Sequence, residues 1–316
     1  MSFVPLHVHD KYSILDGIIT IPDLVKKCQE YKIPAVAQTN HGNLYGTIEF
    51  YKECQKGGIK PLIGIEAYIT SNKDDLTNEE KQRDNYHLVL IAENNIGLKN
   101  LYWLSSQAFL HNFYYKPRIY IKHLIDHNEG LICLSACLKS PIGGHLTFNT
   151  AEKSYFDIEG IAEETIKFLS RLFKNKFYLE IQDHEGLIEQ DIYNEYLLSK
   201  GRQYKLPIVI TTDAHYLNKE DYETHQMILA QQLKTTITEY KKNSNMIYAN
   251  DCYIRPPDEM KQLAKKWNIP SAIDNTLKIA EQCNITIELG KSRMPIYDIK
   301  KAEDFNKFLK WKEKHG

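Results

Sequence analysis

The chain has 316 residues, and its 42% hydrophobic content is enough for one large α/β domain or for one domain with an appendage. A formal net charge of −1 gives no global electrostatic attraction to nucleic acid, and no run of about 18 apolar residues predicts a membrane span. Six scattered cysteines without a C-x-x-C pair, and an N-terminus without the features of a secretory signal, predict reduced thiols and a cytoplasmic protein.

Short apolar runs alternate with helical stretches along most of the chain. We expect seven β-strands, over residues 3–9, 33–39, 60–69, 87–92, 130–136, 176–182 and 206–212. We expect helices that begin at residue 23 and that span 44–56, 98–110, 163–173 and 188–204. Strands that alternate with helices predict βα units and a mainly parallel sheet.

Histidine, cysteine and carboxylate residues lie at the ends of these apolar runs. An H-x-H pair ends the first run and a D-x-H pair closes the last, and single residues follow the runs between them: His7 and His9, Asp213 and His215, then His41, Glu66 and Cys137. Side chains two residues apart on a strand point to the same face. Two imidazoles aimed at one point are typical of a metal site, so the sequence predicts one metal site supplied by several strands.

Ligands from both the first and the last run favour a closed barrel over an open sheet. In a barrel these two strands are neighbours and sites lie at the C-terminal strand ends, whereas an open doubly wound sheet gathers its ligands at one switch point. His87 departs from the pattern because it precedes its apolar run. Either that strand runs in a different direction or the barrel is distorted there.

The candidate ligands are more numerous than one tetrahedral zinc ion needs. A buried carboxylate at Glu66 would be costly without a partner, and a cation would remove that cost. The mixture of nitrogen and oxygen ligands predicts a polynuclear centre of Zn, Mn or Fe that activates water at a phosphoryl group. Isolated histidines are expected not to be ligands, namely His111, His123, His127, His145, His225 and His315.

The pattern changes after residue 215. A helix is expected over 219–233, a short extended segment over 246–255, and one or two helices over 257–283. We therefore expect a barrel domain over residues 1–217, an appendage over 218–300 that packs on it, and a charged helical tail over 301–316.

Ordered motifs run along nearly the whole chain. They are L-H-V-H and Y-S-I-L-D-G within 6–17, T-N-H-G-N-L-Y-G over 39–46, G-I-E-A-Y over 64–68, Y-K-P-R-I over 115–119, E-I-Q-D-H over 180–184, T-D-A-H-Y-L over 212–217 and N-T-L-K-I-A-E-Q-C over 275–283. This series resembles the PHP (polymerase and histidinol phosphatase) domain of bacterial C-family DNA polymerases, the DNA polymerase III alpha subunits.

The resemblance implies a distorted (β/α)7 barrel with a small C-terminal helical appendage. It also implies two or three divalent metal ions and a set of nine ligands: His7, His9, Asp16, His41, Glu66, His87, Cys137, Asp213 and His215. One ion would be held by the first two histidines with Glu66 and Asp213, a second by Glu66, His87 and Cys137, and a third by Asp16, His41 and His215.

The function implied by the resemblance is a metal-dependent phosphoesterase that removes nucleotides from a DNA 3′ end, a 3′→5′ exonuclease of the proofreading kind. Asp213, His215 and Glu66 are the expected catalytic residues. Arg118 is the candidate phosphate contact, with a surface salt bridge as its alternative role. Partners would be the rest of a C-family polymerase, on the same or a separate chain, and a proofreading exonuclease subunit.

Two other functions stay open at this stage. The domain could be a non-catalytic scaffold that supports the polymerase core or docks an exonuclease, or a freestanding phosphatase that resembles histidinol phosphatase. The family usually has Asp where this chain has Asn40, which lacks the charge that could orient a neighbouring ligand. The polymerase palm and fingers have no counterpart in these 316 residues, so no polymerase activity is expected from this chain alone.

Overall fold

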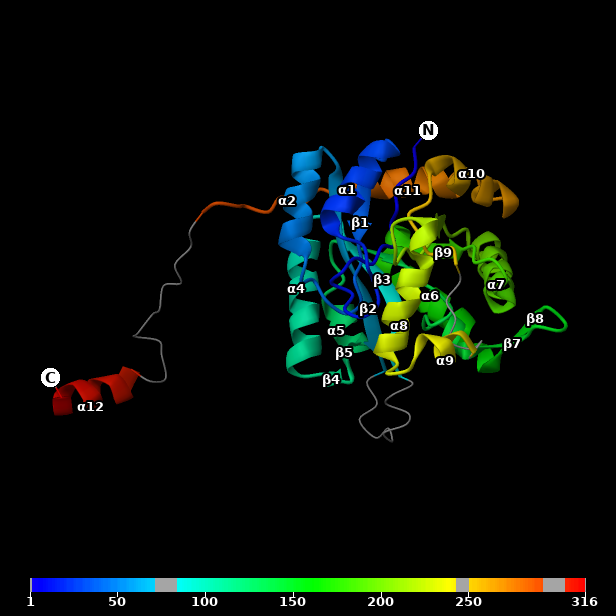
Figure 1. The fold of residues 1–316 in the computed structure, drawn as a ribbon. Coiled ribbons are helices and arrows are strands. Elements are labelled where there is room, and N and C mark those ends of the chain that lie inside the picture. The colour runs from blue at the N-terminus through cyan, green and yellow to red at the C-terminus, as the bar shows by residue number, and fades with distance from the viewer. Residues whose placement is uncertain (1, 72–83, 243–249, 292–304, 316) are drawn as a thin grey trace. The chain divides into compact units, whose positions relative to one another are not determined.

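The computed structural model describes residues 2–71, 84–242, 250–291 and 305–315. Its contacts form two units, one over residues 1–285 and one over 286–316. In the described part of the first unit, strands occupy the centre (Figure 1). On one side lie α1 (Ile21–Glu30), α2 (Thr47–Gly57) and α4 (Asn95–Leu110), and on the other lie α6 (Ile161–Phe173) and α7 (Ile188–Tyr204). Over the described ranges, no helix has both the length and the apolar character that crossing a membrane requires.

The main sheet has eight strands in the order β10-β9-β6-β3-β2-β5-β4, with β1 paired to β2. The strand bounds are β1 (Ala35–Gln38), β2 (Lys60–Thr70), β3 (Tyr86–Ala92), β4 (Phe113–Tyr114), β5 (Lys116–Tyr120), β6 (Leu131–Leu134), β9 (Phe177–Gln182) and β10 (Ile208–Thr211). A separate hairpin joins β7 (Leu146–Asn149) and β8 (Ser154–Asp157). Six of the seven predicted strands are therefore present, and the two hairpins were not predicted.

The seventh predicted strand, residues 3–9, is an extended segment that makes isolated bridges instead of a regular ladder. Pro5 lies within it and has no backbone N–H to donate, which limits regular pairing. The segment nevertheless closes the sheet into a barrel. On one side it accepts hydrogen bonds from Ala37 N and Thr39 N, and on the other it exchanges bonds with Ala214, at 2.7 and 3.1 Å.

Strand β3 explains the position of His87. It runs antiparallel to both of its neighbours, β2 and β6, whereas the β1–β2, β6–β9 and β9–β10 pairs are parallel. The start of β3 therefore lies at the edge where the other strands end. Of the two explanations the sequence left open, the reversed strand direction is the one observed.

The helices α1 to α11 belong to the first unit and surround its strands, whereas α12 belongs to the second unit. Their bounds are α1 (Ile21–Glu30), α2 (Thr47–Gly57), α4 (Asn95–Leu110), α5 (Ile121–Asp126), α6 (Ile161–Phe173), α7 (Ile188–Tyr204), α8 (Tyr222–Gln232), α9 (Ile237–Lys242), α10 (Pro257–Lys266), α11 (Ser271–Gln282) and α12 (Phe305–His315). Short 3₁₀ turns span Gly143–His145, Ile158–Gly160, Lys174–Lys176 and Lys219–Asp221.

Local sequence accounts for the ends of these helices. In α1 the Thr20 side chain accepts a hydrogen bond from Asp23 N, and the buried residues recur at helical spacing. In α2 the chain leaves the helix at Gly58 with φ 68°, a left-handed conformation that glycine adopts without strain.

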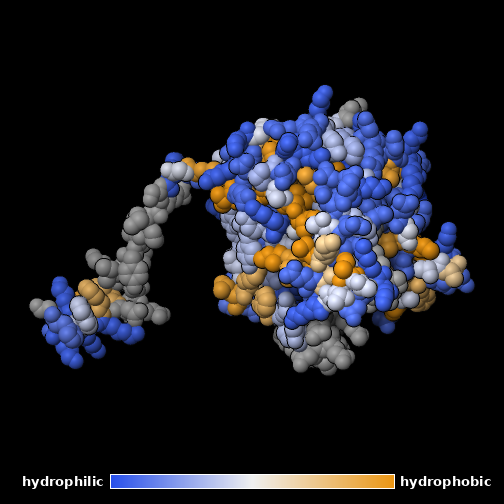
Figure 2. Space-filling model, in the orientation of Figure 1, coloured by the Kyte–Doolittle hydropathy of each residue, from blue (hydrophilic) through white to orange (hydrophobic). Residues whose placement is uncertain are grey.

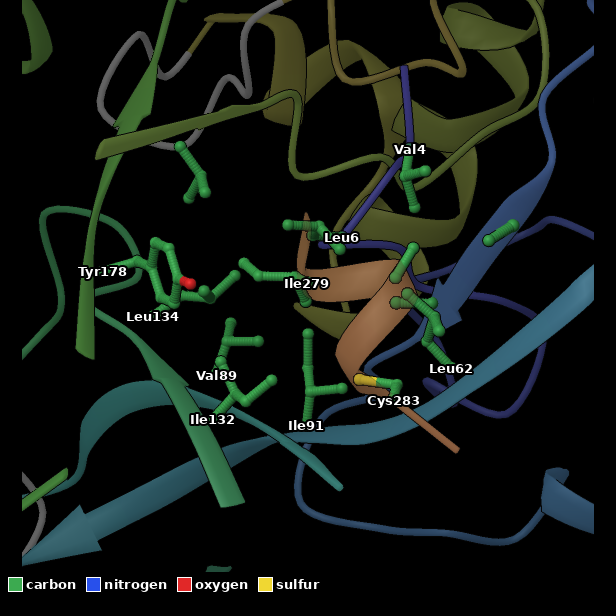
Figure 3. Packing of buried hydrophobic residues seen from close by; sticks show 14 of the residues in the cluster. Val4, Leu6, Leu62, Val89, Ile91, Ile132, Leu134, Tyr178, Ile279 and Cys283 are labelled. Carbon is green, nitrogen blue, oxygen red and sulfur yellow. The ribbon is translucent and has the colours of Figure 1, made fainter. Parts of the chain in front are cut away.

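The residues after 217 contribute to the barrel core. Ile279 and Cys283 at the end of α11 pack with Leu6, Leu134 and the interior residues of other strands (Figure 3). Residues 218–285 thus share one compact unit with the barrel. The division into a barrel, an appendage and a tail stays a prediction, and parts of the expected segments at 246–249 and 301–304 lie outside the described residues.

The barrel interior is apolar in one layer and polar in the next. Leu62 and Val89 belong to the buried apolar cluster, and Glu66 and His87 lie on the same faces of their strands, four residues after the first and two residues before the second. The polar layer therefore lies at the end of the barrel opposite α11. On the outer surface, hydrophilic residues dominate the view of Figure 2, with hydrophobic residues gathered in its centre and lower part.

Candidate metal centre

Eight of the nine predicted ligands lie together at the polar end of the barrel. Their nitrogen and oxygen atoms form three overlapping groups, and within each group all atoms lie within 4.8 Å of one another. The groups are His7, His9, Glu66 and Asp213; His9, Asp16, His41 and His215; and His41, Glu66 and His87. The first group matches the expected first ion, and the second contains the three residues expected for the third ion.

Glu66 is the carboxylate shared between groups. Its Oε2 atom lies 2.7 Å from Nδ1 of His41, 3.2 Å from Nε2 of His9 and 3.5 Å from Nε2 of His7. Its Oε1 atom lies 2.9 Å from Nδ1 of His87. A carboxylate with two oxygens directed at different histidines can bridge two cations, which a neutral imidazole cannot do.

Several of these atoms are buried without a hydrogen bond of acceptable geometry. They are His7 Nε2, His9 Nε2, Asp16 Oδ2, His41 Nδ1, Glu66 Oε2 and Asp213 Oδ1. Buried polar groups are almost always paired, and leaving them unpaired is costly. Because these donor atoms converge, divalent cations would satisfy all of them at once, and the residues present therefore fit a metal centre.

Surrounding groups orient the histidines through their second nitrogen. Nδ1 of His7 donates to the buried carboxylate of Glu180 at 2.7 Å, and Nδ1 of His215 donates to the backbone carbonyl of Asp213 at 2.7 Å. Nδ1 of His9 lies 2.9 Å from Ser13 Oγ, whose own proton is directed to Asn40 Oδ1. With Nδ1 as the nitrogen that donates to these groups, Nε2 of each ring is the atom that would bind an ion.

The carboxylates also set the protonation of the site. Burial alone lowers the pKa of His41, but Glu66 and Asp16 outweigh it and raise this pKa to about 10. Burial likewise opposes protonation of His7, and neighbouring carboxylates, led by Asp213, raise its pKa well above the ordinary value. In the metal-free protein these imidazoles therefore hold protons at neutral pH.

We expect metal binding to release protons, because a ligating histidine must be neutral. Because the pKa values of His7 and His41 are raised, protons compete with Zn²⁺ for these imidazoles, and they compete more strongly at lower pH. The affinity for Zn²⁺ should therefore rise steadily from about pH 6 to about pH 9. Calorimetry in buffers of different ionisation enthalpy should show release of at least about one proton per chain. A binding enthalpy that is the same in every buffer would contradict this assignment.

Two backbone features bring the ligands into range. Asp213 itself has φ 46°, an uncommon conformation for a residue with a side chain, and such strain is found mainly at functional sites. Gly17, next to Asp16, packs so closely that a Cβ atom would lie 2.4 Å from the carbonyl oxygen of Asp10. Only glycine allows this approach of the loop that carries Asp16.

Two predicted site residues, Cys137 and Arg118, do not belong to these ligand groups. Cys137 lines the same cavity as His41, His87, Asp213 and His215, a cavity of about 450 Å³, but belongs to none of the ligand groups found among the described residues. Burial raises the pKa of its thiol to about 12.

Arg118 is buried on β5 with its guanidinium 5.3 Å from the Tyr114 ring, and it is not among the residues that line the cavity. Its role as a phosphate contact stays a prediction. Lys139, which does line the cavity and is exposed, was not singled out by the sequence.

His225 was expected not to be a ligand and is in none of the groups, but it is fully buried beside the site, with its ring 5.5 Å from that of His215. Burial lowers the pKa of His225 to about 4. Glu180 and Ser13 were also missed as supporting residues. A carboxylate in the buried strand Phe177–Gln182 was the signal for the first.

The sequence of this chain is similar to those of known proteins. A family model described as PHP domain matches residues 5–184. The chain is similar to the DNA polymerase III subunit alpha of Chlamydia pneumoniae, with 36% identity over 98% of this chain and 26% of that protein. The corresponding protein of Borreliella burgdorferi is 39% identical over 89% of this chain and 24% of its own length.

The DNA polymerase III subunit alpha of Aquifex aeolicus is 37% identical over 98% of this chain and 27% of its own length. The chain thus spans about a quarter of the curated relatives it matches. A solved structure of a two-domain protein from Bacteroides vulgatus, described as containing a predicted PHP-like metal-dependent phosphoesterase, covers 92% of this chain and 72% of its own, with 11% identity and a TM-score of 0.40.

Proposed function

The chain belongs to the PHP domain family, and we propose that it is a metal-dependent phosphoesterase domain of a DNA polymerase III alpha-like protein. The observation that carries the proposal is the convergence of eight imidazole and carboxylate side chains, six of which each have a buried donor atom without a hydrogen bond of acceptable geometry. Structural carboxylates and histidines are normally paired with each other or with backbone groups. A site that leaves them facing one cavity is built to hold cations.

The chain's own residues have separate tasks in this proposal. His7, His9, Glu66 and Asp213 would hold one ion, and Asp16, His41 and His215 another, with His87 and Cys137 as further ligands. Bound divalent ions activate water and neutralise charge on phosphoryl oxygens. Glu180 and Ser13 fix the orientation of the imidazoles, and the cavity admits the phosphate ester.

The substrate proposed for this site is a phosphodiester at a DNA 3′ end. A cavity of about 450 Å³ falls in the size range of small-molecule sites and would hold one terminal nucleotide. The relatives that this chain matches are DNA polymerase III alpha subunits, and DNA is therefore the substrate that we propose. The rest of a C-family polymerase and a proofreading exonuclease subunit are the proposed partners, and the free cysteines suit a reducing cytoplasm.

The second candidate is a non-catalytic scaffold for the polymerase core. Such a role would not require ligands, whereas eight of the nine are gathered here, so the catalytic function is the better supported. The third candidate, a small-molecule phosphatase, is opposed by the similarity to polymerase subunits over as much as 98% of the chain.

The experiment compares the Mn²⁺- or Zn²⁺-loaded protein with its Asp213→Ala variant on single-stranded DNA labelled at the 5′ end and on p-nitrophenyl phosphate. We expect stepwise shortening of the DNA from its 3′ end, and a loss of at least about 100-fold in the variant. Cleavage of the nitrophenyl ester alone would favour the small-molecule phosphatase. No hydrolysis of either substrate above the level of the variant would favour the scaffold.

A further inference from the structure

His184 lines the same cavity as the candidate metal ligands but does not belong to their groups. It follows β9, is 7% exposed, and shares the cavity wall with His41, His87, Asp213 and His215. Nothing in the proposed metal binding uses it. Its two ring nitrogens nevertheless have well-defined partners on opposite sides.

Both partners of His184 can only accept hydrogen bonds. Nδ1 lies 2.8 Å from Oδ1 of Asp251, and Nε2 lies 3.3 Å from Oε1 of Gln182. The orientation of the Gln182 amide is fixed because its Nε2 donates to the Glu180 carboxylate at 3.0 Å. Its oxygen must therefore face His184. With an acceptor at each nitrogen, both Nδ1 and Nε2 are positioned as hydrogen-bond donors.

The carboxylate beside His184 is itself held ionised. Oδ2 of Asp251 lies 2.9 Å from Nη2 of Arg255 and accepts a hydrogen bond from the backbone N–H of Glu185 at 2.8 Å. Burial alone would raise the pKa of Asp251, but the hydrogen bond from His184 leads the interactions that lower it. Asp251 lies 67 residues from His184 in the chain, so the segment after α9 anchors this histidine.

His184, Asp251 and Cys252 could also be considered as a metal site, because their ligand atoms lie within 4.8 Å of one another. Two observations oppose it. Arg255 already supplies a positive charge to the carboxylate, and Nδ1 of the ring carries the proton that Asp251 accepts, so it has no lone pair to offer. The Cys252 thiol, 3.9 Å from Nδ1, is raised in pKa by burial and is not a thiolate.

We propose that His184 is the general acid of the phosphoesterase reaction and that it protonates the oxygen that leaves phosphorus. This inference rests on the proposed function. As water forms its new bond to phosphorus and loses a proton to solvent, the bond from phosphorus to the leaving oxygen breaks and its electron pair goes to that oxygen. The Nε2 proton moves to the same oxygen, and the electron pair of the N–H bond stays on the ring. The neutral imidazole is then protonated again by solvent.

A general acid matters most when the leaving oxygen is a poor leaving group. The 3′ oxygen of a nucleotide needs a proton as it departs, whereas p-nitrophenolate departs readily without one. Loss of general acid catalysis costs about 10²- to 10⁴-fold for a substrate that depends on it. His184→Asn and His184→Gln should therefore slow DNA hydrolysis by at least about 100-fold, and hydrolysis of bis(p-nitrophenyl) phosphate by less than about threefold.

The experiment measures both rates together with metal content, which should not change because His184 is not a ligand. His127→Asn, a change to a histidine stacked on Trp103 away from the cavity, is the matched control and should leave both rates unchanged. An independent readout is the ¹⁵N NMR spectrum of the metal-free protein. It should show N–H signals from both His184 nitrogens, as donation to Asp251 and Gln182 requires, and Asp251→Asn should weaken the Nδ1 signal.

Equal losses on both esters, no loss on either, or a wild-type spectrum without an N–H signal from Nε2 would overturn the general acid role. A wild-type protein that cleaves neither ester would instead refute the proposed function, and the role of His184 would fall with it. The two failures are thus distinguishable, because only the second abolishes hydrolysis of the nitrophenyl diester by the wild type. Two His184 variants and the Asp251 variant are used so that poor folding of one does not decide the result.

Discussion

Replacing Glu66 with glutamine is expected to remove at least one bound metal ion per chain. Glu66 belongs to two of the three ligand groups and is the carboxylate that faces four histidines. Glutamine keeps the shape of the side chain but places an uncharged amide among imidazole nitrogens. Any ion that Glu66 would hold or bridge loses a ligand, so metal affinity should fall steeply.

The loss should also appear as lower stability of the metal-loaded protein. A ligand that binds only the folded state at about 100 times its dissociation constant adds about 2.7 kcal/mol to the free energy of unfolding. Elemental analysis after dialysis and the metal-dependent rise in Tm measure the two effects. Comparing the rise in Tm, and not Tm itself, separates metal binding from any change in the metal-free fold.

Glu93→Gln is the matched control for this change. Glu93 follows β3 at the end opposite His87 and pairs with Lys176 at the surface, at 2.5 Å. It should alter neither the metal content nor the metal-dependent rise in Tm. If Glu66→Gln behaves like this control, Glu66 is not a metal ligand.

Much of the fold could be predicted because hydrophobic patterns are local. The strands β2, β3, β6, β9 and β10 each form a short apolar run, and their alternation with helices set the expectation of a mainly parallel sheet. Candidate ligands at both the first and the last run set the expectation of a barrel. The direction of β3 could not be deduced, because the run at residues 87–92 reads the same for either direction. The β4–β5 and β7–β8 hairpins were missed because strands of two to five residues, partly exposed, have almost no pattern.

The candidate site also contains residues that could be predicted from the sequence and residues that could not. Residues near the ends of apolar runs, such as His9, Glu66 and His215, are visible in sequence because the runs beside them can be recognised. The residues that orient them are not, because their partners are remote. Asp251 reaches His184 across 67 residues, and Asn40 reaches Asp10 across 30. Only the packed structure shows that these pairs exist.

Asn40 lacks the negative charge expected at this position, and a neighbouring carboxylate compensates for it. Its Nδ2 donates to Oδ1 of Asp10 at 2.7 Å, and its Oδ1 accepts from Asp10 N and from the hydroxyl of Ser13. The negative charge expected at position 40 is therefore supplied by Asp10, and the amide is its hydrogen-bond donor. The pair lies behind His9, to which it connects through Ser13.

Restoring the family's usual residue is consequently expected to destabilise this chain. Asn40→Asp would place a second carboxylate oxygen about where Nδ2 now lies, against the buried Asp10. The two carboxylates must then share a proton, and we expect a loss of about 3 kcal/mol in the free energy of unfolding near pH 8. Denaturant unfolding of the metal-free variant and of the wild type measures it.

The pH dependence gives the sharper test. Sharing a proton raises one carboxyl pKa in the folded state above its unfolded value near about 4, so the folded state binds more protons. The variant therefore keeps its stability relative to the wild type at low pH and loses it as the pH rises through this folded-state pKa. Its deficit in the free energy of unfolding should be smaller at pH 5 than at pH 8. Asn149→Asp, at an exposed hairpin residue whose side-chain oxygen only accepts a bond from Glu152 N, should show neither effect. An Asn40→Asp deficit that is absent, or that does not depend on pH, would show that Asp10 does not supply the charge at this position.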